Sequence, residues 1–362
     1  MAEQAKKTAS EWGEEYQRQQ AIYRAYTEKL RGLMCDLLAE HDLEVALVEA
    51  RAKAVESFVR KIQTKGEKYE EPLQQVTDLA GVRVITYYLE DVEQVGAILA
   101  REFEIDTENS VAKAGEFDPD RFGYLSDHHV LSVCSPRAEL PEWRPFAGFK
   151  VEVQVRTVTQ HAWAAIEHKL RYKSAREAPD NLKRRLSRLS ALFELADDQF
   201  SALRIAAREL EDRYAASVEQ GDLDVPLDAS SLLAYLAESA TAATALEMLV
   251  RHGFSVRQDE EDEEDRERHE MDRSDLLAAL SWAQVGTLKE FENTLVAGLS
   301  KDAGVAQLAA GYRDAGYEGP HFAEDLLTLL VFLVSKPPEE VLRDSSYSER
   351  AVMALLAAYD AE

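Results

Sequence analysis

Strand and helix patterns alternate only in the first part of this chain, and this limits the folds open to it. Strands are expected near 82–89, 103–106, 128–134 and 149–156, and helices over 10–40, 54–64, 91–101, 158–173 and 180–215. From residue 228 onward only helical patterns remain. The sequence therefore predicts an α/β (α+β) sheet domain followed by an all-α domain.

Charge divides the chain in the same way. The 362 residues suit about two domains, and the net charge is −26. Residues 211–362 carry 12 basic and 32 acidic residues, whereas residues 51–210 carry 24 and 26. This balance argues against a protein that coats nucleic acid with its whole surface. We expect a boundary within 211–228, and a solvated loop or exposed helix face at the acidic run 259–272.

Cysteines and hydropathy bear on the cellular setting. Cys35 and Cys134 are the two cysteines of the sequence, so no disulfide framework is expected. The longest apolar stretch, Leu326–Val334, is far shorter than the roughly 18 residues of a membrane helix, and it predicts a buried helix. We expect a cytoplasmic protein without a membrane segment.

The segment 149–157 alternates strictly in polarity. Val151, Val153 and Val155 lie on one face of the predicted strand, and Glu152, Gln154 and Arg156 lie on the other. An antiparallel strand with one solvated face would look the same. However, this strand leads into a helix that begins near His161, and polar groups that converge at a strand end are typical of ligand sites. The spacing of His161 and His168 does not predict a zinc site.

A second acidic residue, Asp78, stands just before the strand that contains Gly81 and Arg83. Taken alone, Asp78 suits a helix or turn cap. If it faces Glu152 on a neighbouring strand, the two carboxylates are the minimum needed to hold Mg²⁺ together with nucleotide phosphates.

A basic cluster precedes this strand, along a predicted strand-to-helix junction. It comprises Arg51, Lys53, Lys61 and Lys65, with Ser57 in the first turn of the helix. Such a cluster suits a triphosphate, although a solvated helix face would look similar. Further along, Gly123 allows a turn, and Tyr124 offers either a stacking surface for a base or a packing residue.

Four motifs in order resemble those of RelA/SpoT-type alarmone synthetases, over about residues 45–210. They read Arg51-x-Lys53-x-x-x-Ser57, Asp78-x-x-Gly81-x-Arg83, Gly123-Tyr124-x-Ser126-x-His128 and Glu152-x-Gln154-x-Arg156-Thr157. The resemblance implies a synthetase domain with a mixed sheet, similar to nucleotidyltransferases. It also implies Mg²⁺-dependent transfer of pyrophosphate from ATP to the 3′-hydroxyl of GDP or GTP.

The resemblance also implies roles for individual residues. Asp78 and Glu152 would hold Mg²⁺, and Glu152 would activate the hydroxyl. The ATP side would comprise Arg51, Lys53, Ser57, Lys61 and Arg83. The acceptor side would comprise Tyr124, Ser126, His128, Gln154, Arg156 and His161.

Some alternatives stay open. Leu125 and Asp127 depart from the usual loop, which has a basic residue after the tyrosine and an apolar one before the histidine. A toxin-like enzyme acting on the tRNA 3′-end, bound by Lys183, Arg184, Arg185 and Arg188, and a non-catalytic nucleotide sensor are therefore alternatives. No hydrolase His-Asp pair precedes the motifs, so synthesis without hydrolysis is expected.

The expected organisation is a helix over 1–44, a synthetase domain over 45–215 and an acidic helical domain over 221–362. By charge complementarity the last of these could act as an internal inhibitor or sensor. Alternatively, it serves partner binding or assembly into a homo-oligomer.

Overall fold

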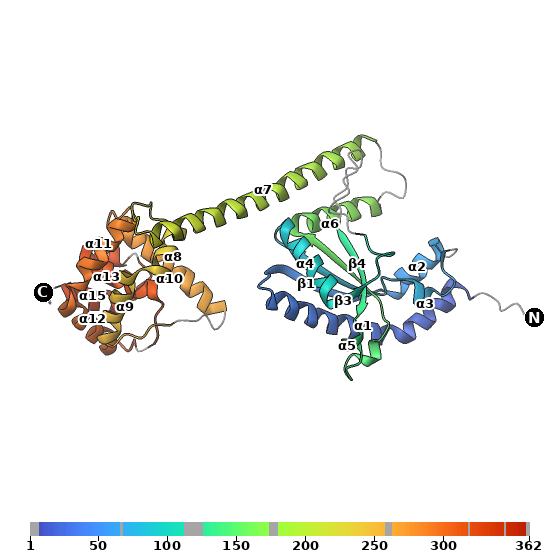
Figure 1. Ribbon diagram of the computed structural model, residues 1–362, viewed down its shortest axis with the longest axis horizontal. Coiled ribbons are helices and arrows are strands. Elements are labelled where there is room, and N and C mark those ends of the chain that lie inside the picture. The colour runs from blue at the N-terminus through green and yellow to red at the C-terminus, as the bar shows by residue number, and fades with distance from the viewer. Residues whose placement is uncertain are drawn as a thin grey trace, which may run out of the picture. The chain divides into compact units, whose positions relative to one another are not determined.

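The computed structural model describes residues 7–65, 68–111, 126–173, 180–257, 263–317, 319–343 and 345–359, without the side chains of 168, 170–173 and 180–183. The chain forms two compact units, Met1–Arg204 and Ile205–Glu362 (Figure 1). The helix α7 (Asp180–Glu219) contributes residues to both units. Each unit is described by itself.

A mixed five-stranded sheet forms the centre of the N-terminal unit. Its strands are β1 (Val45–Ala52), β2 (Ala80–Thr86), β3 (Phe103–Ile105), β4 (Asp127–Val133) and β5 (Val151–Thr157), in the order β1-β2-β5-β4-β3. Strands β2 and β5 are parallel, and the other neighbours are antiparallel. The expectation of a mixed sheet is confirmed.

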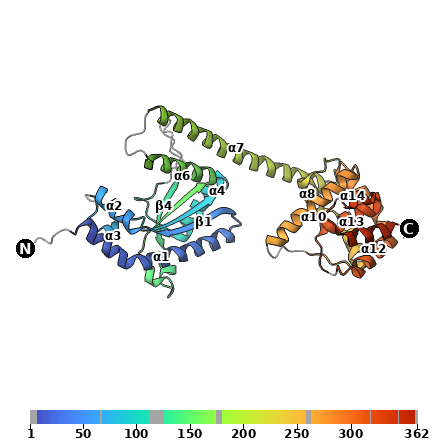
Figure 2. The ribbon, with the colours of Figure 1, turned by 180° about the vertical axis from the view of Figure 1, so that it is seen from behind.

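The helices of this unit lie between the strands in sequence. They are α1 (Ala9–Glu40), α2 (Val55–Lys65), α3 (Pro72–Gln75), α4 (Leu89–Glu102), α5 (Ser135–Ala138) and α6 (Val158–Lys173), with a 3₁₀ turn at Arg144–Phe146. Helix α1 runs alongside the sheet (Figure 2). The predicted helices over 10–40 and 158–173 correspond to α1 and α6 within one residue at each end.

The main hydrophobic core of this unit packs against one face of the sheet. The alternating side chains Val82 and Val84 of β2 and Val151, Val153 and Val155 of β5 pack with tyrosines of α1 and valines of α4. Because neighbouring residues of a strand point to opposite faces, the polar residues of β2 and β5 lie on the other face. The alternation in sequence thus separates a core face from a face that is free to bind a ligand.

The strand expected at 82–89 is wrong at its end. Strand β2 stops at Thr86, and α4 already starts at Leu89. The hydroxyl of Thr86 donates to the carbonyl of Tyr88, and Glu90 and Asp91 stand in the first helical turn, where acidic residues favour a helix N-terminus. These local interactions override the β-type composition of the two tyrosines.

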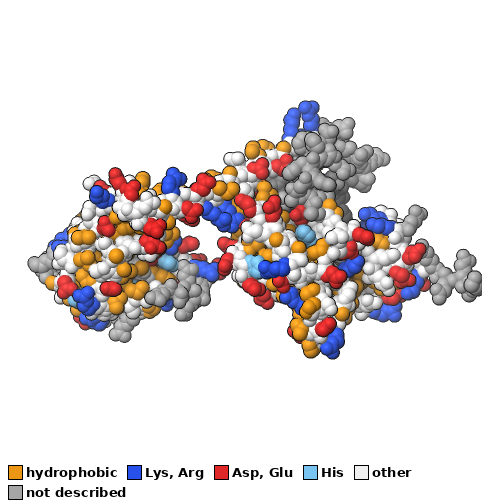
Figure 3. All heavy atoms as spheres, viewed as in Figure 1, with side chains coloured by type: hydrophobic (Ala, Val, Ile, Leu, Met, Phe, Trp, Pro, Cys, Tyr) orange, Lys and Arg blue, Asp and Glu red, His pale blue; other side chains and the backbone are white. Residues whose placement is uncertain are grey.

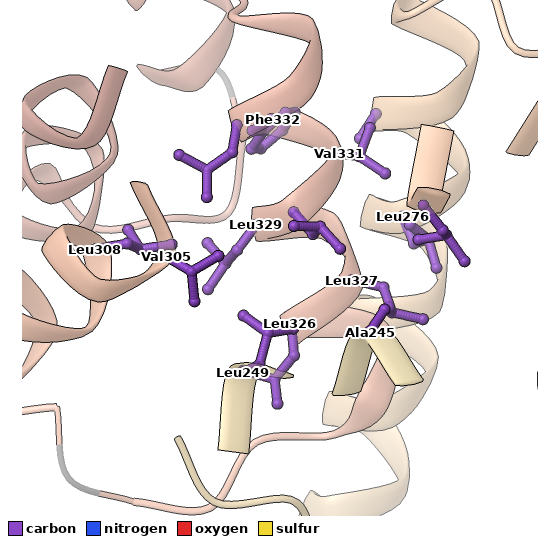
Figure 4. Packing of buried hydrophobic residues seen from close by; sticks show 14 of the residues in the cluster. Ala245, Leu249, Leu276, Val305, Leu308, Leu326, Leu327, Leu329, Val331 and Phe332 are labelled. Carbon is purple, nitrogen blue, oxygen red and sulfur yellow. The ribbon is translucent and has the colours of Figure 1, made fainter. Parts of the chain in front are cut away.

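The C-terminal unit is helical, as expected. Besides the end of α7 it contains α8 (Ala229–Glu238), α9 (Ala240–Arg251), α10 (Glu263–Trp282), α11 (Leu288–Leu299), α12 (Asp302–Asp314), α13 (Ala323–Ser335), α14 (Glu339–Arg343) and α15 (Glu349–Tyr359). Helix α13 lies at the centre of its core, and Leu326, Leu327 and Leu329 pack against α9, α10 and α12 (Figure 4). The predicted buried helix at Leu326–Val334 is confirmed.

Part of the acidic run forms a helix. Residues 263–272 are the first half of α10, and residues 258–262 lie outside the described part. Acidic side chains are spread over the visible face of the C-terminal unit (Figure 3). Within the described residues no single helix is long and apolar enough to cross a membrane. Helices α8 and α9 reach that length and apolar composition only when taken together, and a bend of 74° separates them.

Candidate active site

The polar face of the sheet forms the floor of the candidate site. Gly81 of β2 pairs with Arg51 of β1 on one side and with Glu152 of β5 on the other. A Cβ on Gly81 would lie 3.7 Å from the carbonyl oxygen of Arg51 and 3.9 Å from that of Glu152, which are ordinary contacts. Gly81 therefore leaves open space above the floor and relieves no steric clash.

The next row across the sheet contains Glu49, Arg83, Gln154 and His128, from β1, β2, β5 and β4. An Nη atom of Arg83 lies 2.9 Å from a carboxylate oxygen of Glu49. The strand register therefore brings together residues that are up to 105 positions apart in sequence.

A cavity of about 620 Å³ lies above these rows. Its lining includes most of the predicted ATP-side residues and both predicted catalytic carboxylates. The charged or polar residues around it are Glu49, Arg51, Lys53, Ser57, Asp78, Arg83, Glu152 and Gln154. The volume is within the range usual for small-molecule sites.

Asp78 lies in the turn before β2 and accepts hydrogen bonds from two lysines. Lys53 Nζ lies 2.6 Å from Oδ2, and Lys61 Nζ lies 2.9 Å from Oδ1. Burial opposes ionisation of Asp78, but the hydrogen bonds and charges of Lys53 and Lys61 hold its pKa below the usual value. Asp78 is thus an anion at neutral pH, close to two cations.

Helix α1 holds the backbone around this carboxylate. The Tyr16 hydroxyl donates to the carbonyl of Lys53 at 2.8 Å and is 3.4 Å from that of Leu79. The amide of Gln20 also donates to the Lys53 carbonyl, at 3.1 Å. These hydrogen bonds from α1 were not predicted from the sequence, because their only sign there is a polar side chain, Tyr16, on the buried face of a long helix.

Glu152 lies on the neighbouring strand and accepts two hydrogen bonds on one oxygen. His128 Nδ1 lies 3.0 Å and Gln154 Nε2 lies 2.7 Å from Glu152 Oε1. Burial and the negative charge of Asp78 raise the pKa of Glu152, but the bonds from His128 and Gln154 outweigh them and lower it. Asp78 and Glu152 line the same cavity, so the two carboxylates share one site.

Further cations follow along the same face. Arg156 is 7% exposed, and burial, followed by the charge of Arg83, lowers its pKa to about 10. Burial and the charges of Arg156 and Arg83 also lower the pKa of His161. The Nε atoms of Arg83 and Arg156 are buried and donate to no residue in the described part of the chain. Buried donors of this kind are suited to an anionic ligand.

The structure therefore brings most of the predicted site residues together. Arg51, Lys53, Ser57, Asp78, Arg83, Glu152 and Gln154 line one cavity, and Lys61, Ser126 and His128 are connected to it by hydrogen bonds. The charge of Arg83 acts on both Arg156 and His161. Tyr124 lies outside the described residues. Glu49, which pairs with Arg83, was not anticipated, because a strand at 45–52 was not delimited from the sequence.

The donor set fits a magnesium ion shared with a nucleotide. In the described part of the chain, no three His, Cys, Asp or Glu side chains form a metal-binding group. Asp78 and Glu152 nevertheless supply two carboxylates around one cavity, and Mg²⁺ typically takes one or two carboxylates and completes its shell with phosphates and water.

Comparison with known proteins identifies the domain that carries this site. Residues 50–177 match a family profile described as a region found in RelA / SpoT proteins. The chain thus contains a RelA/SpoT domain, and the matched residues include every predicted site residue from Arg51 to His161.

Two curated relatives are GTP pyrophosphokinases of Bacillus subtilis strain 168. YjbM is 28% identical over 194 residues, which are 52% of this chain and 85% of YjbM. YwaC is 26% identical over 160 residues, which are 43% of this chain and 72% of YwaC.

Solved structures of related proteins are also similar to part of the chain. The crystal structure of small alarmone synthetase 1 from Bacillus subtilis has 25% identity and a TM-score of 0.45, covering 54% of this chain and 98% of that one. The same synthetase bound to its product pppGpp has 26% identity and a TM-score of 0.44, covering 52% and 96%.

Proposed function

We propose that this protein transfers the β,γ-pyrophosphate of ATP to the 3′-hydroxyl of GDP or GTP, with Mg²⁺ as cofactor. The observation that carries the proposal is the convergence of Asp78, Glu152 and at least four cations around one cavity in the RelA/SpoT domain. The names of the two curated relatives support the same activity.

The charges of the site suit this chemistry. The acceptor oxygen attacks the β-phosphorus of ATP, the bond from that phosphorus to the α,β-bridging oxygen breaks, and AMP leaves with the bridging oxygen. Such a transfer depends chiefly on positioning and on neutralising phosphate charge. Arg51, Lys53, Lys61 and Arg83 supply positive charge on the side of the cavity formed by β1, α2 and β2.

Glu152 takes the proton in this proposal. As an ionised carboxylate at the cavity wall it accepts the proton of the acceptor hydroxyl, and the proton later passes to solvent. Asp78 and Glu152 would hold Mg²⁺, which neutralises charge on the phosphates. Lys53 and Lys61 keep Asp78 ionised, and Lys53 also lines the cavity, where its ammonium group can bind phosphate oxygens.

The test follows label from [γ-³²P]ATP into GDP, GTP or deacylated tRNA, offered separately with Mg²⁺. Label should appear on GDP or GTP, with AMP as co-product. Glu152→Gln should lower the rate by about 100- to 10,000-fold. The matched control is Glu104→Gln, at an exposed carboxylate of β3 in the same unit. Label on tRNA would move the acceptor to RNA, and no transfer to any acceptor would refute the proposal.

A further inference from the structure

The imidazole of His128 connects two other side chains of the candidate site. Ser126 Oγ lies 2.9 Å from His128 Nε2, and Glu152 Oε1 lies 3.0 Å from His128 Nδ1. The pairing of β4 with β5 fixes this geometry, because His128 stands opposite Gln154, two residues from Glu152 on the same face. Both ring nitrogens therefore already have partners within the protein.

These partners define the tautomer of His128. An ionised carboxylate can only accept, so Nδ1 must carry the hydrogen that it donates to Glu152 Oε1. A neutral imidazole then accepts at Nε2, where the Ser126 hydroxyl donates. Since the carboxylate is fixed through Oε1 by both His128 and Gln154, and the described residues place no hydrogen bond on Oε2, Oε2 is the oxygen available to a ligand.

We propose that His128 is a positioning residue for Glu152, rather than a contact of the acceptor nucleotide. This inference rests on the proposed function and deepens it. His128 and Gln154 fix one carboxylate oxygen, so that the other meets the acceptor hydroxyl, and Ser126 selects the tautomer of His128 that can donate. No nitrogen of His128 is left to bind the acceptor.

The experiment uses the full-length protein and separates positioning from binding by kinetics. His128→Ala removes the donor, and kcat should fall by about 10- to 100-fold while KM for the acceptor changes less than about twofold. His128→Asn places an amide nitrogen near the position of Nδ1 and should restore kcat to within about threefold of wild type. Ser126→Ala should give an intermediate kcat.

The neighbouring histidine provides a matched control. His129 points to the opposite face of β4, where its ring lies 3.8 Å from the position of a Cβ on Gly96 in α4. His129→Ala should leave kcat and KM within about twofold of wild type, because that face belongs to the core. Near-ultraviolet circular dichroism verifies that each variant is folded.

A spectroscopic measurement tests the geometry without activity. In the ¹⁵N-histidine spectrum of the free protein, the signals lost in His128→Asn should be those of an imidazole protonated at Nδ1 and unprotonated at Nε2. A proton on Nε2 instead would overturn the proposal. So would an increase in acceptor KM with kcat retained in His128→Ala, or a failure of His128→Asn to restore kcat. If the wild type transfers nothing, the proposed function itself fails, which these outcomes distinguish.

Discussion

Each unit of this protein contains a hydrogen-bonded pair of histidine and glutamate, and the two pairs differ in their burial and in whether the described residues leave a carboxylate oxygen unbonded. In the C-terminal unit, Nε2 of His269 lies 3.0 and 3.1 Å from the two carboxylate oxygens of Glu324, whose side chain is 5% exposed. In the N-terminal unit, His128 and Gln154 both bind Oε1 of Glu152, which lines a cavity. In the C-terminal pair both oxygens of Glu324 are bonded, and the pair joins α10 to α13. In the N-terminal pair Glu152 is bonded through Oε1, and its other oxygen is available for chemistry.

The elements around the two pairs explain this difference. Helix α13 is buried along almost its whole length, so any charge on it must be neutralised inside the core. Strands β2 and β5 alternate between a core face and a polar face, so they can carry charges without placing them in the core. A half-buried sheet is therefore the better support for a site that binds charged phosphates.

Of the substitutions that test this comparison, Asp78→Asn should have the largest effect, and the effect should be on the rate of pyrophosphate transfer. Loss of this carboxylate removes a proposed metal ligand and the anion between Lys53 and Lys61, so the rate of pyrophosphate transfer should fall by about 100- to 1000-fold. The measurement is the transfer of label from ATP. Asp106→Asn is the matched control, because Asp106 also binds a lysine, Lys150 at 2.6 Å, but does not line the cavity. Equal loss in both variants would contradict a special role of Asp78.

Glu324→Gln should have the opposite result: it should lower the stability of the C-terminal unit and leave the transfer rate unchanged. It removes the negative charge that pairs with Arg273 and to which His269 is hydrogen-bonded, and breaking a buried ion pair costs about 3 to 5 kcal/mol of unfolding free energy. Denaturant unfolding followed by circular dichroism should show the C-terminal unit less stable, with the transfer rate unchanged in native buffer. Glu339→Gln, at an exposed i,i+4 pair with Arg343, should change stability little. A large loss of transfer in Glu324→Gln would break the comparison.

Tyr16→Phe tests whether the helix behind the sheet supports the site. The variant keeps the buried ring but loses the hydroxyl that binds the carbonyl of Lys53. We expect a loss of about 1 to 2 kcal/mol in unfolding free energy, and a fall in transfer rate of less than about tenfold. Tyr87→Phe removes an exposed hydroxyl in the same unit and should change neither quantity. A transfer rate equal to wild type in Tyr16→Phe would limit Tyr16 to stability.

Much of this arrangement could be predicted from the sequence. Alternation in Val151–Thr157 gave the two faces of β5, and helical periodicity gave α1 and α13, because both signals are local. The order of the strands and their register could not be derived from composition or periodicity. The hydrogen bond between His128 and Glu152 depends on that register, and so does the pairing of Glu49 with Arg83. These contacts join residues that are far apart in sequence. The pattern within one strand does not predict which strand will lie beside it, or in which register.

The smallest effect concerns a carboxylate of the C-terminal unit. Burial and the negative charge of Asp325 raise the pKa of Asp272 to about 7. An acid whose pKa is raised on folding binds more protons in the folded state, so stability falls as pH rises from about 4 to about 7. Asp272→Asn is neutral at every pH and resembles the protonated acid. It should therefore raise the Tm of the C-terminal unit at pH 8 by a few degrees, and change it much less at pH 4, where the acid is largely protonated in the unfolded chain as well. Asp314→Asn, at an exposed residue of α12, should show no such difference between the two pH values. Glu324 and Asp325 already have hydrogen-bond partners in the folded unit. An effect of Asp272→Asn that does not depend on pH would mean that the charge of Asp272 is neutralised there too. In that case the C-terminal unit would pair all three carboxylates, as it pairs Glu324.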